Sequence, residues 1–363
     1  MRYRARVPPR VLLATDSLLP SANGIGRVAR LTARVLADLA RRGELQVRAI
    51  SLSDDRAATD LGLPIKAFHG SRARFVLACQ TAALGCTHFV YDFAGMARAH
   101  PRWMRPRRRS LVWVHGVEIW EQARPDRVRT LARADALVTN TEYTRARADR
   151  IHGGFSRATP CWLGTETDDL PAEGPRPSGS DNVLLLGRID PGGGEKGHRE
   201  LIECWPAVVH AVPTARLLFA GGGPAESLVR TWVERSPARD HIDLLGFVPE
   251  EKLAALWSRT AVFAMPARGE GLGLAYLEAM RHGIPIVASV HDAAPEINLH
   301  EVTGYNVDLD QRNDLATRII QLLRDRQLQE RLGSAGRDRW QTHFRYSAFQ
   351  ARFESVLRQF LAR

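Results

Sequence analysis

The stretch RVLLATDSLLPSANGIGRVARLTARVLADLARRGELQVRAI, residues 10–50, contains the strand–helix–strand pattern that decides the fold class. Its first six residues form a short apolar run that predicts a strand, and residues 45–50 predict a second one. Between them, residues 25–41 repeat apolar side chains at helical spacing, and Gly43 ends that pattern. A strand, a helix and a strand in this order predict a parallel sheet covered by helices.

The same alternation continues on both sides of a single break in composition. Further apolar runs that predict strands lie at residues 87–91, 111–114, 136–139, 183–186, 216–220, 261–264 and 284–288. The break, TDDLPAEGPRPSGSDN at residues 167–182, is rich in Pro, Gly, Ser and Asp and predicts a linker. We therefore expect an α/β protein of two doubly wound, Rossmann-like domains that face each other across a cleft, with ligands at the carboxyl ends of the strands.

The linker predicts the domain boundaries. The N-terminal domain would span residues 1–166 and the C-terminal domain residues 183–344. From residue 312 onward the pattern is almost wholly helical, and residues 345–363 are expected to form a helix that packs back on the N-terminal domain. A length of 363 residues agrees with two domains of roughly 150 residues each.

Composition excludes several classes of protein. Apolar residues make up 44% and charged residues 25%, which is typical of a globular chain rather than a disordered or fibrous one. No run of about 18 uncharged apolar residues predicts a membrane span, and the N-terminus lacks the apolar segment of a signal peptide, so we expect a cytoplasmic protein. The cysteines have neither disulfide-framework nor zinc spacing and are expected to remain thiols; they are Cys79, Cys86, Cys161 and Cys204.

The charge balance suggests a polyanionic partner. Against 40 acidic residues stand 51 basic ones, a net charge of +11, which suits nucleic acid, anionic lipid or a phosphorylated ligand. Residues 102–109 contain five arginines beside Trp103 and Met104, a composition that suits an anionic membrane surface on the inner face of the cell membrane. A solvated loop is the alternative. No nucleic-acid recognition module accompanies the charge, so we expect no nucleic-acid partner.

Two segments offer amides or cations to an anion. Gly24 and Gly26 open the first helix, where backbone N–H groups can approach an anion, although the spacing is not that of the dinucleotide fingerprint. A flexible loop is the other interpretation. Arg188 and Lys196 follow the first strand of the second half and could clamp a diphosphate, the first as a fork and the second as a point charge. Their alternative is a pair of solvated loop charges.

A third segment, PARGEGLG at residues 266–273, leads into a helix that ends at Gly283. Glu270 precedes this helix and Glu278 lies eight residues later, at most about 12 Å away along the axis. Ionised carboxylates only accept hydrogen bonds, so each suits a pair of sugar hydroxyls, one on either side of a diphosphate that faces the amides of residues 271–274. Glu270 could instead be a simple helix-start charge that the dipole favours.

These segments resemble glycosyltransferase family 4. Its EGFG…EA signature is similar to Glu270-Gly271-Leu272-Gly273 followed by Leu277-Glu278-Ala279-Met280. Its GR(L/I)…KGH…LIEA stretch is similar to Gly187-Arg188-Ile189-Asp190, Lys196-Gly197-His198 and Leu201-Ile202-Glu203. The matches occur in order and cover nearly the whole chain.

Two further matches carry departures from the family pattern. Gly24-Ile25-Gly26-Arg27 resembles the N-terminal GGIGR loop, with Asn23 in place of the first glycine. Pro295-Glu296…Thr303-Gly304 resembles the PE…TG stretch, although His291-Asp292-Ala293-Ala294 replaces the glycines usual before it.

The resemblance implies the GT-B fold and a retaining, metal-independent transferase without a cofactor. It would move a hexose such as mannose or glucose from a nucleoside-diphosphate sugar to a hydroxyl of a lipid-linked or oligosaccharide acceptor, in surface polysaccharide or glycolipid assembly. No DxD-like pair lies at a suitable strand end, which agrees with metal independence. The alternatives are a nucleotide-sugar epimerase or phosphorylase of the same fold, and a catalytically silent binding or scaffold subunit. We find no motif for the pyridoxal-phosphate lysine that a phosphorylase needs.

The resemblance also implies roles for individual residues. The catalytic group would be His115, Arg188, Lys196 and Glu270, with His115 beside the reacting carbon. The donor-binding group would be Gly24, Gly26, Phe247, Val248, Gly271, Leu272, Gly273, Leu274 and Glu278. Glu118 is a candidate acceptor contact, with a plain surface residue as its alternative. Residues 221–224, GGGP, are expected to form only a tight turn.

Overall fold

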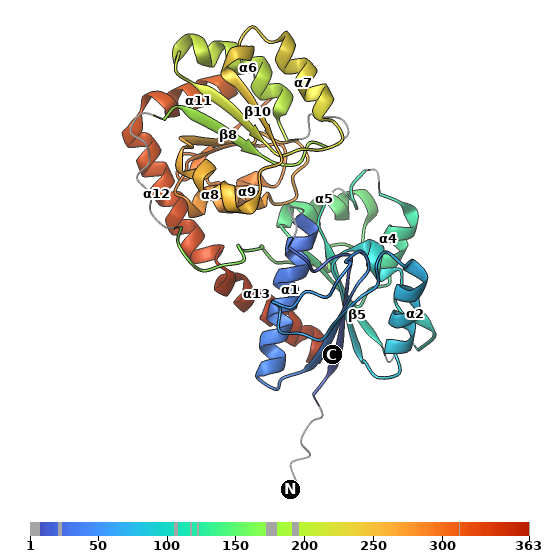
Figure 1. Cartoon of the computed structure of the whole chain (residues 1–363). Coiled ribbons are helices and arrows are strands. Elements are labelled where there is room, and N and C mark those ends of the chain that lie inside the picture. Colours follow the sequence, from blue (N-terminus) through green and yellow to red (C-terminus); the bar gives the residue numbers. More distant parts are fainter. Residues whose placement is uncertain are drawn as a thin grey trace. The chain divides into compact units, whose positions relative to one another are not determined.

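The chain forms two compact units in a computed structural model (Figure 1). Unit 1 comprises Met1–Glu166 and Tyr346–Arg363, and unit 2 comprises Thr167–Arg345. The residues that the structure describes are 8–20, 24–104, 108–116, 118–121, 123–171, 180–190, 196–311 and 313–362. Half of the predicted linker, residues 172–179, lies outside them.

Unit 1 is built on a parallel sheet of seven strands in the order β3-β2-β1-β4-β5-β6-β7. The strands are β1 (Arg10–Thr15), β2 (Gln46–Ser51), β3 (Ile65–Ala67), β4 (His88–Tyr91), β5 (Arg109–Val114), β6 (Ala136–Thr139) and β7 (Thr159–Pro160). The helices are α1 (Gly24–Arg41), α2 (Arg72–Ala82), α3 (Ala94–Ala97), η1 (Arg102–Met104), α4 (Pro125–Ala132), α5 (Glu142–His152) and α13 (Tyr346–Ala362). Strand β1 pairs with both β2 and β4, so the strand order reverses there, which is where ligands of doubly wound sheets bind.

Unit 2 repeats this plan with six strands in the order β10-β9-β8-β11-β12-β13. The strands are β8 (Asn182–Leu186), β9 (Arg216–Ala220), β10 (Ile242–Gly246), β11 (Val262–Ala264), β12 (Ile286–Ser289) and β13 (Gly304–Val307). The helices are α6 (His198–Ala211), α7 (Glu226–Arg235), η2 (Arg239–His241), α8 (Glu250–Ser258), α9 (Leu274–Arg281), α10 (Ala294–Ile297), α11 (Asp314–Arg324) and α12 (Arg326–His343). Here the order reverses between β8 and β11. The predicted fold class of two doubly wound units is confirmed.

The central strands are buried because apolar side chains cover both of their faces. In β4 and β12 every residue is buried, and in β1 only the first one is exposed. Such strands produce the continuous apolar runs that the sequence shows. All strands predicted from those runs exist, with ends displaced by at most two residues.

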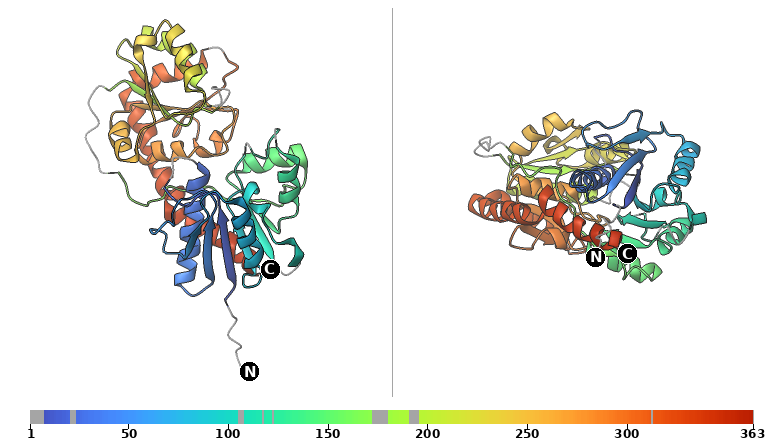
Figure 2. Two further views of the ribbon diagram at one scale, coloured as in Figure 1. Left: turned by 45° about the vertical axis from the view of Figure 1, so that its right-hand side comes forward. Right: turned by 90° about the horizontal axis from the view of Figure 1, so that it is seen from below.

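Helix α13 lies along the unit 1 sheet, although it follows unit 2 in the sequence (Figure 2). Its Phe349 and Phe353 rings lie 6.4 and 5.1 Å from the ring of Trp113 in β5, measured between centroids. Its Phe360 ring lies 5.1 Å from the ring of His88 in β4. The C-terminal helix therefore completes the apolar core of unit 1.

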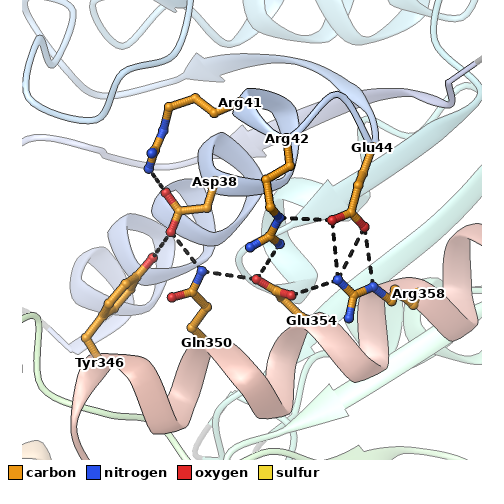
Figure 3. Close-up of polar contacts among 8 residues, drawn as sticks. All are labelled: Asp38, Arg41, Arg42, Glu44, Tyr346, Gln350, Glu354 and Arg358. Atoms are coloured by element: carbon orange, nitrogen blue, oxygen red, sulfur yellow. Dashed lines mark hydrogen bonds and ion pairs between the residues drawn. The ribbon is translucent and has the colours of Figure 1, made fainter.

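Polar contacts join α13 to α1 beside this apolar face (Figure 3). Asp38 accepts hydrogen bonds from the Tyr346 hydroxyl at 3.0 Å and from Gln350 Nε2 at 2.9 Å. Two arginines, Arg42 and Arg358, each pair with both Glu44 and Glu354, at distances of 2.6 to 3.3 Å. These contacts hold α13 along the helix whose first turn contains Gly24 and Gly26.

Within the described residues, no helix combines the length and apolar character that a membrane span needs. The four cysteines are free thiols, as expected. Burial raises the pKa of the Cys79, Cys161 and Cys204 thiols to about 12, so they carry no thiolate near neutral pH.

Candidate active site

Unit 2 brings together two of the four predicted catalytic residues, Lys196 and Glu270. Lys196 lies just before α6, and Glu270 lies in the loop between β11 and α9. The Lys196 Nζ atom is 2.5 Å from Glu270 Oε2, and the two side chains are 24% and 20% exposed. The other carboxylate oxygen, Oε1, accepts a hydrogen bond from the Gly273 amide at 3.1 Å. Glu270 thus bridges the lysine and the N-terminus of α9.

The pair is charged because each member compensates the other. Burial alone would raise the pKa of Glu270, but the Lys196 ammonium and nearby amides hold it below its ordinary value. Burial would likewise lower the pKa of Lys196, and the charge of Glu270 raises it instead. At neutral pH the loops therefore present an ammonium and a carboxylate side by side in a partly dry environment.

Gly273 allows this arrangement because of its backbone conformation. Its φ of 82° lies in the left-handed region that favours glycine. A Cβ atom there would lie 2.3 Å from the Tyr276 ring and 3.3 Å from Glu270 Cγ. The glycine is thus needed both for the turn into α9 and for the approach of Glu270.

Arg188, the third predicted catalytic residue in unit 2, has a different environment. Its side chain is 61% exposed, and its Nε atom lies 2.7 Å from Asp190 Oδ1. Residues 191–195, which join this segment to Lys196, lie outside the described residues. The structure therefore presents Arg188 as an exposed cation whose ion-pair partner is Asp190.

The loop after β9, residues 221–224, is more than the tight turn that was expected. A Cβ atom at Gly221, whose φ is 123°, would lie 2.1 Å from the Gly187 carbonyl oxygen. The Ile189 amide donates to the Gly222 carbonyl at 3.2 Å, so this loop supports the segment that contains Arg188. Gly221 and Gly223 are therefore required for close packing, since a Cβ atom at Gly223 would also lie 2.1 Å from a carbonyl oxygen, that of Ile189.

The predicted donor-binding residues of unit 2 follow the same strand ends. Gly271, Leu272 and Leu274 continue the turn from Glu270 into α9, with Leu272 buried. Glu278 lies one turn further along α9, where its carboxylate is 3.6 Å from Arg281 Nη1. Phe247 and Val248 follow β10, and the Phe247 side chain is 68% exposed, so its ring is free to stack on a planar group.

In unit 1, His115 lies at the carboxyl end of β5. Its Nε2 atom is 2.6 Å from the Asp92 carbonyl oxygen, and its Nδ1 atom is 3.1 Å from Asn140 Oδ1. The ring stacks on Trp113 with an interplanar angle of 4°. Glu118, the candidate acceptor contact, accepts a hydrogen bond from the His115 amide at 2.6 Å. Glu118 therefore holds the turn that carries the histidine.

The N-terminal loop is only partly described. Helix α1 begins at Gly24, one residue earlier than predicted, and Gly26 is buried in its first turn. Asn23 lies outside the described residues. The preceding segment is anchored by Leu18, whose amide donates to Asp54 Oδ2 at 2.8 Å.

Sequence analysis missed two buried acids at these strand ends. Asp92 is fully buried after β4, where its Oδ2 accepts from the Asp16 amide at 2.9 Å and its carbonyl oxygen contacts His115. Burial raises the pKa of Asp92 well above its usual range. Asp292, before α10, is 2% exposed and contacts the main chain of Glu270. A lone aspartate after a strand belongs to no pattern, and the only sequence signal was that Asp292 stands where the family has glycine.

Sequence comparison finds glycosyl transferases, both as a family and as individual relatives. The profile of the family described as glycosyl transferases group 1 matches residues 166–339. A GDP-mannose-dependent alpha-(1-6)-phosphatidylinositol monomannoside mannosyltransferase of Mycobacterium tuberculosis is 30% identical over 274 residues, which are 69% of each chain. An N-acetyl-alpha-D-glucosaminyl L-malate synthase of Bacillus anthracis is 26% identical over 44% of this chain and 41% of its own.

Solved structures share the fold over nearly the full length. HepE of Anabaena, crystallised with UDP and glucose, superposes with a TM-score of 0.78 at 16% identity, covering 97% of this chain and 100% of its own. Sucrose-phosphate synthase of Thermosynechococcus elongatus has a TM-score of 0.78 at 20% identity, covering 98% and 99%. At these identities the likeness shows the architecture and not the substrate.

Proposed function

The chain belongs to the group 1 glycosyl transferases of the GT-B fold, and we propose that it transfers a hexose from a nucleoside-diphosphate sugar to a hydroxyl of a glycolipid or oligosaccharide acceptor, with retention of configuration. The observation that carries the proposal is the Lys196–Glu270 pair at the start of α9, within the segments that resemble the family signature. The Mycobacterium tuberculosis relative is GDP-mannose-dependent and acts on a phosphatidylinositol monomannoside. Mannose and a glycolipid are therefore the first donor sugar and acceptor to test.

The proposed mechanism stabilises the leaving diphosphate without a metal. Lys196 supplies a point charge, Arg188 an exposed fork, and the N-terminus of α9 the positive end of a helix dipole. In the proposed mechanism these groups take the place of the Mg²⁺ that other transferases use, because they stabilise the negative charge that develops on the leaving diphosphate oxygen. Glu270 accepts hydrogen bonds from the sugar hydroxyls, Glu278 from the ribose, and Phe247 stacks on the base.

We propose that the acceptor attacks on the face from which the diphosphate leaves. The bond between the sugar C1 and the phosphate oxygen breaks, the acceptor oxygen bonds to C1, and the acceptor proton passes to the departing phosphate oxygen. A double displacement would need a carboxylate nucleophile on the opposite face. The carboxylates of unit 2 already hold the donor, and His115 is the unit 1 group proposed beside the reacting carbon.

A donor panel and a product analysis test the function. Thermal shift with GDP-mannose, UDP-glucose and ADP-glucose should identify one stabilising donor. Transfer to a phosphatidylinositol mannoside should then proceed equally with and without EDTA. Proton NMR of the first product from an α-linked donor should show an α linkage, and a β linkage would contradict retention. Hydrolysis or epimerisation without any transfer would favour the alternative enzymes, and the absence of all turnover would favour a binding subunit.

We further propose that unit 1 binds anionic membranes through a basic and apolar surface around α2. Leu77 lies in α2 and Leu84 in the turn that follows its last residue, Ala82; they are 62% and 74% exposed. Trp103 is 62% exposed, and its Nε1 donates to Gln80 Oε1 at 2.9 Å, which brings η1 to the end of α2. We define the α2 surface as Arg74, Leu77, Leu84, Arg102 and Trp103, all of them exposed.

This surface has the composition of an interfacial anchor. Leucines and a tryptophan can enter the headgroup region while arginines pair with anionic lipid at about 1 kcal/mol each. Arg105 and Arg107 of the predicted basic run lie outside the described residues. Because the attraction is electrostatic, binding should weaken as salt rises.

Vesicle co-sedimentation tests membrane binding. The protein should sediment with phosphatidylglycerol vesicles at low salt and much less with phosphatidylcholine vesicles. The double variant Leu77→Gln/Trp103→Gln should lose most of this binding. Leu228→Gln is the matched control, since Leu228 is an exposed leucine on α7 of unit 2. Equal sedimentation with both vesicle types would show that the run is only a solvated face.

A further inference from the structure

Asp292 connects the loop of Glu270 to the next strand end. Its Oδ2 atom accepts a hydrogen bond from the Glu270 amide at 3.3 Å, and its Oδ1 atom accepts from the Ala294 amide at 2.8 Å. In return, the Ala293 amide donates to the Glu270 carbonyl oxygen at 3.2 Å. The main chain of Glu270 is therefore held on both sides by the segment that follows β12.

The charges around Asp292 are unequal. One ammonium, that of Lys196, faces two carboxylates, those of Glu270 and Asp292. Tyr276, on α9, also lies near both acids, but its hydroxyl donates to the Met265 carbonyl at 2.6 Å. Asp190 adds a further negative charge near Lys196, and Arg188 pairs with Asp190 at 2.7 Å. With all three acids ionised, three carboxylates stand against two cations, and the excess negative charge opposes binding of a diphosphate.

Protonation of Asp292 removes part of this excess. Burial raises the pKa of Asp292 to about 8, and the charge of Glu270 acts in the same direction, while the Ala294 and Glu270 amides and Lys196 oppose it. The segment also departs from the family pattern at this position, where the resemblance predicts glycine. A buried acid therefore lies beside the proposed donor-binding pair.

We propose that Asp292 is a positioning residue that fixes the Glu270 loop and couples donor binding to uptake of a proton. The inference rests on the proposed function, because it takes the ligand of Lys196 to be a nucleoside diphosphate. The negative charges of a bound diphosphate favour the neutral form of Asp292. By reciprocity, the neutral form of Asp292 favours binding of the diphosphate. Donor affinity should therefore fall as pH rises above 8.

Nucleotide binding against pH provides the first test. The dissociation constants of GDP and UDP, measured in parallel from pH 6.5 to 9.5, should rise by up to about tenfold per pH unit above pH 8 for the preferred nucleotide. In Asp292→Asn this rise should largely disappear, because the amide does not titrate. Its single acceptor oxygen can replace only one of the two hydrogen bonds, so kcat should also fall about tenfold as Glu270 loses its support. Asp243→Asn, on β10, is the matched control and should behave as the parent protein.

Thermal unfolding gives a readout that needs neither nucleotide nor turnover. Since folding raises the pKa of Asp292 from 3.8 to about 8, the protonated acid stabilises the fold at acidic pH. This contribution is lost as pH rises from about 4 to about 8, so Tm should fall less steeply over that window in Asp292→Asn.

The outcomes distinguish a failure of the Asp292 role from a failure of the proposed function. If the parent protein binds a nucleotide and transfers sugar, yet Asp292→Asn keeps the same pH dependence of affinity and Tm, the role of Asp292 is wrong and the proposed function stands. If the parent protein binds no nucleotide at any pH, both are overturned. Should the variant fail to fold, calorimetry of the parent protein in buffers of different ionisation enthalpy still decides, because the inference requires proton uptake near pH 8.

Discussion

Lys196 and Glu270 have a structural role in addition to their proposed catalytic role. Arg188 has only the proposed catalytic role. The first two form a partly buried pair, so removing the lysine leaves the carboxylate uncompensated. Arg188 is an exposed side chain paired with Asp190, and such pairs contribute little to stability. The two cations of the proposed diphosphate clamp can therefore be distinguished experimentally.

We predict that Lys196→Ala and Arg188→Ala each lower turnover by about two to three orders of magnitude, as expected for the loss of one charge-stabilising donor. Only Lys196→Ala should also lower the free energy of unfolding, by about 1–3 kcal/mol, since the pair is less than fully buried. Urea unfolding and steady-state kinetics measure both effects. Near-normal turnover in the folded double variant would contradict the clamp.

His115 should affect the chemical step and not nucleotide binding. His115→Ala removes the ring that contacts Asp92 and Asn140, and we expect kcat to fall at least about tenfold with the Kd of the nucleotide unchanged. His152→Ala is the matched control, because His152 Nε2 makes a similar contact to the Ile119 carbonyl at 2.7 Å in the same unit. Equal losses in the two variants would indicate a purely structural role for His115.

The site residues that the sequence predicts lie in continuous motifs, whereas those it does not predict are brought together only by the fold. Glu270, Gly273 and Lys196 belong to ordered motifs, because a turn, a helix start and a cation must follow one another in the chain. Asp92 follows β4 and contacts two other strand ends, through the Asp16 amide after β1 and the His115 ring after β5. Such a convergence exists only after the sheet has formed, so no spacing in the sequence records it.

At the scale of elements, α9 is the helix that presents the proposed donor site. Its first residue follows Gly273, whose amide already binds Glu270 Oε1. A side chain at Gly273 would meet both the left-handed backbone and the Tyr276 ring. A Cβ atom at residue 273 would therefore displace the buried Tyr276 ring or the Glu270 side chain.

We therefore predict that Gly273→Ala lowers the free energy of unfolding by about 1–3 kcal/mol and reduces turnover severely. Gly269→Ala provides the control, because Gly269 lies in the same loop, has no positive φ, and a Cβ there would have no neighbour within 4 Å. Thermal unfolding and donor titration should distinguish the two variants. Equal effects would show that any side chain in this loop is harmful.

Continuous apolar runs predict the central strands, and strands such as β4 and β12, which are apolar on both faces, were predicted. Strands β10 and β13 were not predicted, because Asp243 and Asn306 interrupt their apolar residues. The edge strands β3 and β7 have three and two residues and are partly or fully exposed, so no apolar run marks them. Helix α10 has four residues, too few to repeat a helical pattern.

At the scale of the whole molecule, sequence order and structural order differ. The chain enters unit 2 at Thr167 and returns to unit 1 at Tyr346. The first crossing coincides with the start of a Pro- and Gly-rich segment that the composition reveals. The second lies between the end of α12 at His343 and the start of α13, beside the boundary that was expected after residue 344, although composition shows no break there.

The two units should therefore lose stability independently, with the C-terminal helix counted in unit 1. Phe353, in α13, is fully buried against Trp113, and Leu322, in α11, is fully buried in unit 2. Phe353→Ala and Leu322→Ala should each cost about 2–5 kcal/mol, because each leaves a cavity in a packed core. Amide hydrogen exchange locates the loss.

In Phe353→Ala, exchange should accelerate in β4 and β5 and stay unchanged in β8 and β9, although residue 353 follows unit 2 in the chain. In Leu322→Ala the pattern should be reversed. The reason is that local opening depends on the core to which a side chain belongs and not on its place in the sequence. Faster exchange throughout both sheets in either variant would mean that the molecule unfolds as one cooperative body, and the division into two units would then describe its architecture but not its stability.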